Sequence, residues 1–192
     1  MNKFLCLLSM LLLMTKVYSQ SVFIENGVSL SSLQNVYDQM ICKYHMNVGV
    51  NYLDKKWCFL SSSLGYLRKG GQYSYLYAEE IGKESSLCHN ESAKYVTLNT
   101  LFNLKYEKSN MIFYLGIGPQ IGVNVGNSII SDYDKLKKIN YCLKSTLGIN
   151  CCLNRFLLGG SFGYIPTLGH MFETKEGNDK TFTVSLLVGY IL

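Results

Sequence analysis

Proline and charged residues are scarce in this sequence. Only two of its 192 residues are proline and 16% are charged, whereas 15 are tyrosine. Disordered chains have the opposite composition, because they are poor in aromatic residues and rich in proline and charge. The length suits one domain. The formal net charge is +5 and no basic tract is present, so nucleic acid is not an expected partner.

Patterns that bind metals or carry out catalysis are also missing. The sequence contains no CxxC pair, and its three histidines, His45, His89 and His170, are scattered. We therefore expect no metal and no cofactor. His89 and Ser92 place a base and a hydroxyl in one polar stretch. A hydrolase would need such groups on rigid, adjacent elements, so a polar loop is the preferred interpretation.

Long apolar runs are confined to the N-terminus. Lys3 precedes an apolar core over 4–14, and Ser19 supplies a small residue at the expected cleavage point. This pattern predicts a secretory signal peptide over 1–19, which leaves a mature domain over 20–192. After it, no apolar run approaches the 18 residues that a membrane helix requires. Any membrane span must then be built from strands.

The stretch 111–126 alternates between two kinds of residue. Every second position is apolar: Met111, Phe113, Leu115, Ile117, Pro119, Ile121, Val123 and Val125. The positions between them include four glycines, a glutamine and an asparagine. Because side chains alternate across a strand, this pattern predicts a strand with one apolar face. Its length exceeds the 9–11 or so residues that cross a membrane.

Similar alternation divides the chain into eight strands. We predict them over 22–30, 45–53, 57–67, 95–107, 111–126, 139–153, 155–168 and 180–192. Helical spacing within 31–44 allows a short helix there. Short turns join strands two to three, four to five and six to seven, and long connections join the others. This asymmetry predicts an eight-stranded antiparallel up-and-down transmembrane β-barrel, all-β, with both termini on the periplasmic side of the outer membrane.

Two observations favour a membrane barrel over a soluble lipocalin-like ligand-binding barrel. The polar face carries glycine, asparagine, threonine and lysine, which line an apolar ligand cavity poorly and suit a small filled lumen. Aromatic residues of the apolar face gather near the strand ends, as in interfacial girdles. The predicted girdle residues near the short turns are Tyr52, Tyr106, Phe113, Phe156 and Tyr190, and those towards the long loops are Tyr66, Tyr141, Tyr164 and Phe182.

Short motifs add a family resemblance. The run Phe113-Tyr114-Leu115-Gly116, followed by Gly118-Pro119-Gln120, resembles the fifth strand of the small PorT-like outer-membrane protein β-barrel domain family. The segment 95–106 resembles the strand before it, and Val188-Gly189-Tyr190 resembles the closing strand. The resemblance covers roughly 22–192. It implies an eight-stranded barrel of the outer membrane.

Five charged residues fall on predicted inward positions: Glu25, Lys105, Glu107, Lys144 and Arg155. Because buried charges need partners, we expect them to pair and plug the lumen. An eight-stranded barrel leaves an interior that side chains just fill, so no diffusion pore is expected. The expected partners are outer-membrane lipid and, during insertion, the barrel-assembly machinery, and we expect a monomer.

The predicted loops offer fewer signals. Tyr73, Tyr75 and Tyr77 alternate in the longest connection, which allows strands three and four to continue beyond the membrane as a hairpin. The three tyrosines are also candidates for contacts with an extracellular ligand or protein. Cys42 and Cys88 form the one disulfide pair that we entertain; otherwise the cysteines are small apolar fillers. We therefore expect a non-enzymatic outer-membrane barrel with a structural or surface-interaction role. A lipid A-modifying hydrolase or acyltransferase is the enzymatic alternative.

Overall fold

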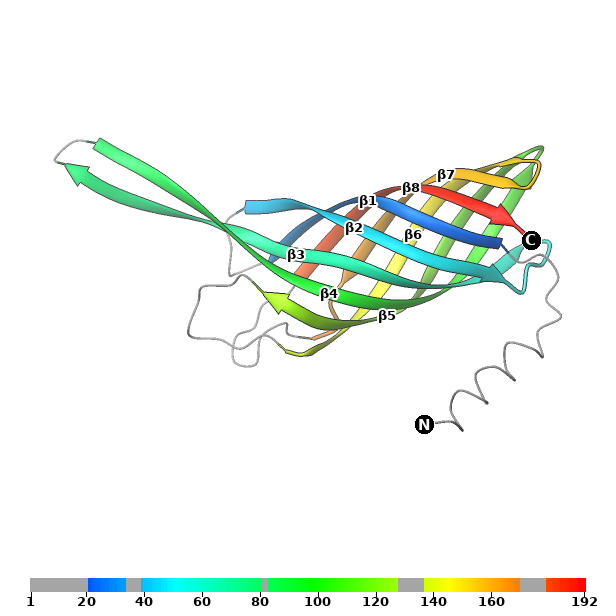
Figure 1. Cartoon of the computed structure of the whole chain (residues 1–192), viewed down its shortest axis with the longest axis horizontal. Coiled ribbons are helices and arrows are strands. Elements are labelled where there is room, and N and C mark those ends of the chain that lie inside the picture. The colour runs from blue at the N-terminus through cyan, green and yellow to red at the C-terminus, as the bar shows by residue number, and fades with distance from the viewer. Residues whose placement is uncertain (1–20, 34–38, 81–82, 128–136, 170–178) are drawn as a thin grey trace.

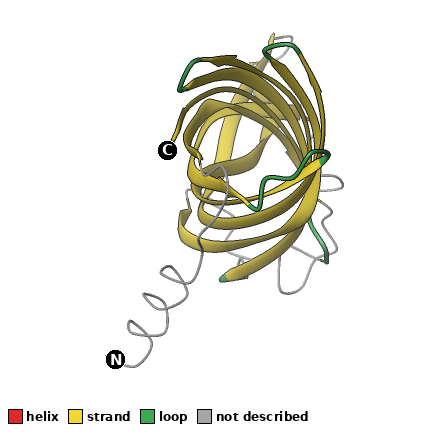
Figure 2. Ribbon diagram, turned by 90° about the vertical axis from the view of Figure 1, so that its right-hand side faces the viewer, coloured by secondary structure: helices red, strands yellow, loops and turns green. Residues whose placement is uncertain are grey.

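The strands of this protein close into a barrel. The computed structural model describes residues 21–33, 39–80, 83–127, 137–169 and 179–192. Its strands are β1 (Ser21–Leu33), β2 (Gln39–Tyr52), β3 (Cys58–Glu80), β4 (Lys83–Lys108), β5 (Met111–Asn127), β6 (Ile139–Leu153), β7 (Phe156–Pro166) and β8 (Asp179–Ile191). Each strand is antiparallel to its sequence neighbours, and β1 pairs with β8 to close the sheet (Figures 1 and 2). The predicted eight-stranded antiparallel barrel is confirmed.

The two ends of the barrel differ. The connections β2–β3, β4–β5 and β6–β7 lie at the end where β8 finishes, which we call the short-turn end (Figure 1). Ser109 and Asn154 make the tight turns there with positive φ angles of 55° and 54°. At the opposite, long-loop end, β3 and β4 continue together as a hairpin far beyond the other strands (Figure 1). By the usual asymmetry of such barrels, the short-turn end is periplasmic.

The outer face of the barrel is apolar. On β5, all eight alternating residues from Met111 to Val125 are exposed, whereas Tyr114 and Gln120 between them are buried. Exposed apolar side chains occur on every strand, up to 73% exposure for Leu186 on β8. A water-soluble protein rarely exposes so continuous an apolar surface. The belt suits the hydrocarbon of a lipid bilayer, where a closed sheet also satisfies every backbone group.

Several predicted boundaries need correction. The short helix allowed within 31–44 is absent from the described part of that segment, because 31–33 belong to β1 and 39–44 to β2, where pairing such as Ser31 with Ile41 overrides the helical spacing. The predicted polar connection 68–94 is mostly hairpin, since β3 runs to Glu80 and β4 starts at Lys83. Strand seven ends at Pro166 rather than at 168. No helix long and apolar enough to cross a membrane occurs among the described residues.

Candidate functional site

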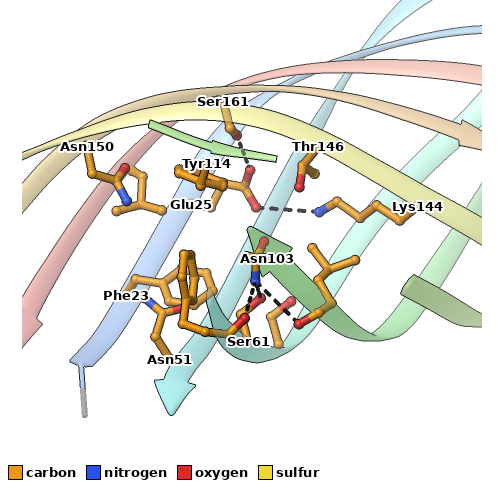
Figure 3. A pocket seen from close by; sticks show the side chains of 14 residues that line it. Phe23, Glu25, Asn51, Ser61, Asn103, Tyr114, Lys144, Thr146, Asn150 and Ser161 are labelled. Carbon is orange, nitrogen blue, oxygen red and sulfur yellow. Dashed lines mark hydrogen bonds and ion pairs between the residues drawn. The ribbon is translucent and has the colours of Figure 1, made fainter. Parts of the chain in front are cut away.

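A buried carboxylate occupies the middle of the lumen. Glu25 on β1 points inward and is 6% exposed. Its carboxylate accepts a hydrogen bond from Ser161 at 2.6 Å, and Lys144 Nζ lies 3.7 Å away (Figure 3). It also accepts a hydrogen bond from Asn47 at 2.8 Å. These partners come from β7, β2 and β6, so one carboxylate on β1 contacts side chains of three other strands. Such a network gives a buried charge the partners that it needs.

Amides and hydroxyls fill the lumen on the β3–β4 side. Asn99 donates to Ser63 at 3.1 Å. Asn103 donates to Ser61 at 3.0 Å (Figure 3). Each of these asparagines is 1% exposed. The row of hydrogen bonds therefore lies in a packed interior. Several buried polar atoms remain without a partner, among them Asn99 Oδ1, Asn140 Nδ2 and Thr146 Oγ1.

A serine and a histidine meet across the closing seam. Gly27 on β1 pairs with His45 on one side and with Ser185 on the other. His45 Nε2 and Ser185 Oγ lie 3.0 Å apart and are buried. A hydroxyl next to an imidazole resembles the nucleophile–base pair of a hydrolase, although His45 Nδ1 has no hydrogen-bond partner to orient it. Sequence reasoning missed this pair because 140 residues separate the two positions.

An ion pair lies inside the long-loop end of the lumen. Lys69 Nζ on β3 donates to Asp179 Oδ2 on β8 at 2.6 Å, and both side chains are at most 2% exposed. Asp179 also accepts hydrogen bonds from Thr167 and Thr181, each at 3.1 Å. Lys69 lies 3.5 Å from the Cys142 sulfur as well. This cluster connects strands on different sides of the lumen and fills it there.

The short-turn end has a second ion-pair group. Lys105 on β4 pairs with Asp54, in the turn that follows β2, and with Glu107 at 2.5 Å. Next to this end, an inward apolar cluster of Phe23, Leu157 and Leu187 packs across β1, β7 and β8, with Ile112, Cys152 and Ile191 against it. Charge and apolar packing together fill this end of the barrel.

The five predicted lumen charges do not form one plug. Glu25 and Lys144 meet in the middle of the barrel, and Lys105 and Glu107 meet at the short-turn end. Arg155 is exposed in the turn between β6 and β7, where it donates to the Tyr190 hydroxyl at 3.3 Å. Its placement in the lumen was wrong, because the strand that was predicted to start at 155 begins at Phe156.

The predicted girdle residues all lie on described strands. Tyr106, Tyr141, Phe156 and Phe113 are exposed on the outer face. The others are partly exposed: Tyr52, Tyr66, Tyr164, Phe182 and Tyr190. Two cross-strand pairs of girdle residues bring their rings into contact. Phe156 and Tyr190 meet edge to face at 5.6 Å at the short-turn end, and Tyr164 and Phe182 stack at 5.0 Å towards the long-loop end.

Other predicted residues fall partly outside the described side chains. Tyr73, Tyr75 and Tyr77 have strand backbone in β3, opposite His89, Leu87 and Ser85 of β4, but their side chains lie outside the described part, as do those of Cys88 and His89. Cys42 is exposed with a free thiol. Ser92 is buried and accepts a hydrogen bond from Arg68 at 3.0 Å.

The lumen has little room for a ligand. The lumen cavities given for the described residues are small. One, of about 30 Å³, is lined by Glu25, Tyr114 and Lys144 among others (Figure 3), and one of about 50 Å³ lies beside Asp54 and Lys105. Each holds at most a few water molecules. No group of three potential metal ligands occurs in the described ranges. Neither cavity is lined by Ser185 or His45.

Solved structures show the same architecture. Neisserial surface protein A aligns with a TM-score of 0.58 at 13% identity, over 90% of this chain and 98% of that protein. Ail of Yersinia pestis, solved in complex with the heparin analogue sucrose octasulfate, gives 0.55 at 13% identity over 91% and 98%. OprG of Pseudomonas aeruginosa, an outer-membrane protein, gives 0.55 at 10% over 92% and 97%. The fold is that of small outer-membrane barrels.

The apolar belt agrees with this fold and decides between a membrane barrel and a soluble one. A closed barrel with a filled lumen and an apolar exterior is built for lipid, so the protein is located in the cell outer membrane. The chain matches no protein-family model, and no characterised protein is similar to it in sequence. The PorT-like resemblance therefore stays a prediction, while the eight-stranded barrel that it implied is present.

Proposed function

We propose that this protein is a small non-enzymatic outer-membrane barrel that makes surface contacts through its long-loop end. The β3–β4 hairpin supports the proposal. The last pair between β2 and β3 among the described residues is Gln39 with Gln72, and β5 leaves β4 at Asn127 opposite Ala93. Beyond these points the hairpin pairs with itself as far as Glu80 and Lys83. We also propose that the chain is a member of the PorT-like family.

A hairpin of this kind suits recognition. Its two outer edges have no described partner strand, and an exposed edge can accept an extended segment of another protein through main-chain hydrogen bonds. Tyr73, Tyr75 and Tyr77 would add apolar area with polar tips to such a contact. The filled barrel would then serve as the membrane anchor of the hairpin. Lipid and the barrel-assembly machinery are the partners that we propose for the barrel itself.

The hairpin can be removed without breaking the barrel. Replacing 73–89 with Asn-Gly joins Gln72 to Asn90, which already pair directly, through a turn that two-residue hairpins favour. We expect the shortened protein to keep the heat-shifted gel mobility of a folded barrel. Aggregation and surface adhesion of intact cells that display it should fall to the level of cells without the protein.

Two comparisons make this test decisive. The Tyr73→Ala/Tyr75→Ala/Tyr77→Ala variant keeps the hairpin and should lose most of the adhesion, since it removes the predicted contact side chains. Outer-membrane permeability to a dye should be the same for all three proteins. Unchanged adhesion combined with leaky cells would instead assign the protein a role in membrane integrity.

The filled lumen predicts a barrel without a pore. In a planar lipid bilayer, the purified protein should give no sizeable, stable conductance steps. The reason is that lumen cavities of about 30 and 50 Å³ are far too small to form a continuous channel. A wide-pore porin in the same bilayer provides the positive control. Long-lived open steps from this protein would contradict the closed-lumen proposal.

A further inference from the structure

An asparagine side chain interrupts the lipid-facing belt of β1 at mid-height. Asn26 is the third of the five exposed residues of β1, between Val22 and Ile24 on one side and Val28 and Leu30 on the other. It is exposed and pairs in register with Met46 of β2 and Leu186 of β8. Its amide therefore lies on the outer face, away from both ends of the barrel, where apolar neighbours surround it.

The Asn26 side chain has no hydrogen-bond partner among the described residues, unlike the outward hydroxyls of Ser62, Thr100 and Tyr52. Ser62 and Thr100, on β3 and β4, lie 3.3 Å apart and bond to each other, and the Tyr52 hydroxyl lies 3.0 Å from Ser62. An amide has two donor hydrogens and an accepting oxygen. In hydrocarbon, where no water is present, each of these groups needs a protein partner.

The surface around Asn26 is hollowed. A shallow depression of about 810 Å³ includes Asn26 and Gly27 in its floor. Apolar side chains of β1, β2 and β8 line it: Ile24, Val28, Tyr44, Val184, Leu186 and Val188. Leu186, at 73% exposure, is the most exposed of the large apolar residues in this lining. The depression thus combines apolar lining with one unsatisfied amide, and packing against it would bury both.

We propose that a second copy of this chain packs on this surface, with the two Asn26 amides hydrogen-bonded to each other about a twofold axis. Lipid tails carry no hydrogen-bonding groups, so they cannot satisfy the amide. A second copy brings an amide at the same depth. Two amides are self-complementary, because each donates to the oxygen of the other, and a twofold interface requires such self-complementarity. Leu186 of each copy would fill part of the facing depression.

This dimer replaces the monomer that the sequence led us to expect. In a membrane, polar groups between packed segments provide association that apolar contact alone does not. The interface would comprise β8, β1 and β2 and leave the long-loop end of both copies accessible.

Cysteine cross-linking in lipid vesicles tests the proposal. In a background with all native cysteines replaced by serine, Val28→Cys places a thiol beside the proposed axis and should give a disulfide-linked dimer on mild oxidation. Adding Asn26→Leu should lower the cross-linked fraction about tenfold, since both amide hydrogen bonds are lost. Asn26→Leu keeps the side-chain size and suits the lipid environment, so the barrel should still fold and show heat-shifted mobility.

Two controls separate specific pairing from random collision. Leu115→Cys on β5 is equally lipid-facing but belongs to another part of the wall, and it should not cross-link above the collision level. Thr100→Leu added to Val28→Cys removes a lipid-facing polar group that already has a partner, and it should leave the cross-linking unchanged. Equal cross-linking from Val28→Cys with and without Asn26→Leu, or a wild-type protein of monomer mass in vesicles, would overturn the proposal.

Discussion

Replacing Lys69 with methionine is expected to destabilise the barrel by about 3–5 kcal/mol. The substitution leaves Asp179 buried at 1% exposure without its counter-charge. Thr167 and Thr181 would still donate hydrogen bonds to the carboxylate, but neither hydroxyl supplies a positive charge. Methionine fills the space of the aliphatic part of lysine, so the lost charge rather than a cavity dominates the effect.

Urea unfolding in lipid vesicles measures this change. The chain has a single tryptophan, Trp57, which is exposed at the short-turn end and reports on unfolding by fluorescence. The double variant Lys69→Met/Asp179→Leu removes both charges and should regain most of the lost stability. Lys94→Met changes an exposed lysine and should stay within about 0.5 kcal/mol of the wild type. A Lys69→Met variant as stable as Lys94→Met would show that the buried ion pair does not stabilise the barrel.

Gly27→Ala is expected to prevent the barrel from closing, at a cost of about 3 kcal/mol or more. A Cβ atom at this position would lie 2.0 Å from the Val184 carbonyl oxygen and 2.7 Å from Ser185 Cα. Both atoms belong to the backbone of β8, so no side-chain rotation relieves the clash. Either β1 moves away from β8 and loses ladder hydrogen bonds, or the chain remains unfolded.

The same substitution at Gly126 is the matched control, because a Cβ atom there meets only Lys94 Cδ at 3.7 Å, an ordinary contact. Refolding into detergent followed by electrophoresis without boiling gives the fraction of compact barrel. We expect Gly126→Ala to run like the wild type and Gly27→Ala to run mostly as unfolded protein. A compact Gly27→Ala band of normal intensity would mean that the seam is looser than the structure shows.

The architecture was predictable because every strand that crosses the lipid must present an apolar outer face. Alternation in 111–126 and 180–192 marks an apolar outer face, and the turn lengths fix the meander, so the strand count and order follow. Outside the membrane a strand does not need an apolar outer face. The extension of β3 and β4 therefore showed only the weak alternation of Tyr73, Tyr75 and Tyr77, which allowed a hairpin without fixing its length.

The lumen was harder to predict because its contacts depend on register around the whole ring. Glu25 meets Ser161 across 136 residues of sequence, and Lys69 meets Asp179 across 110. Alternation shows that a side chain points inward but not at which height or against which neighbour. Inward apolar residues such as Phe59 and Leu101 also interrupt the alternation on their strands, since a narrow lumen accepts apolar and polar side chains alike.

The seam between β1 and β8 has a consequence for how the chain is made. The first strand to leave the ribosome pairs along its length with the last, from Ser21 with Ile191 to Leu33 with Asp179. Until the final residues exist, β1 has an open edge that could pair with another chain. Export and insertion must therefore keep the unfinished sheet away from other strands. Closure depends on the most distant contacts in the sequence, and its rate sets how long the open edge needs protection.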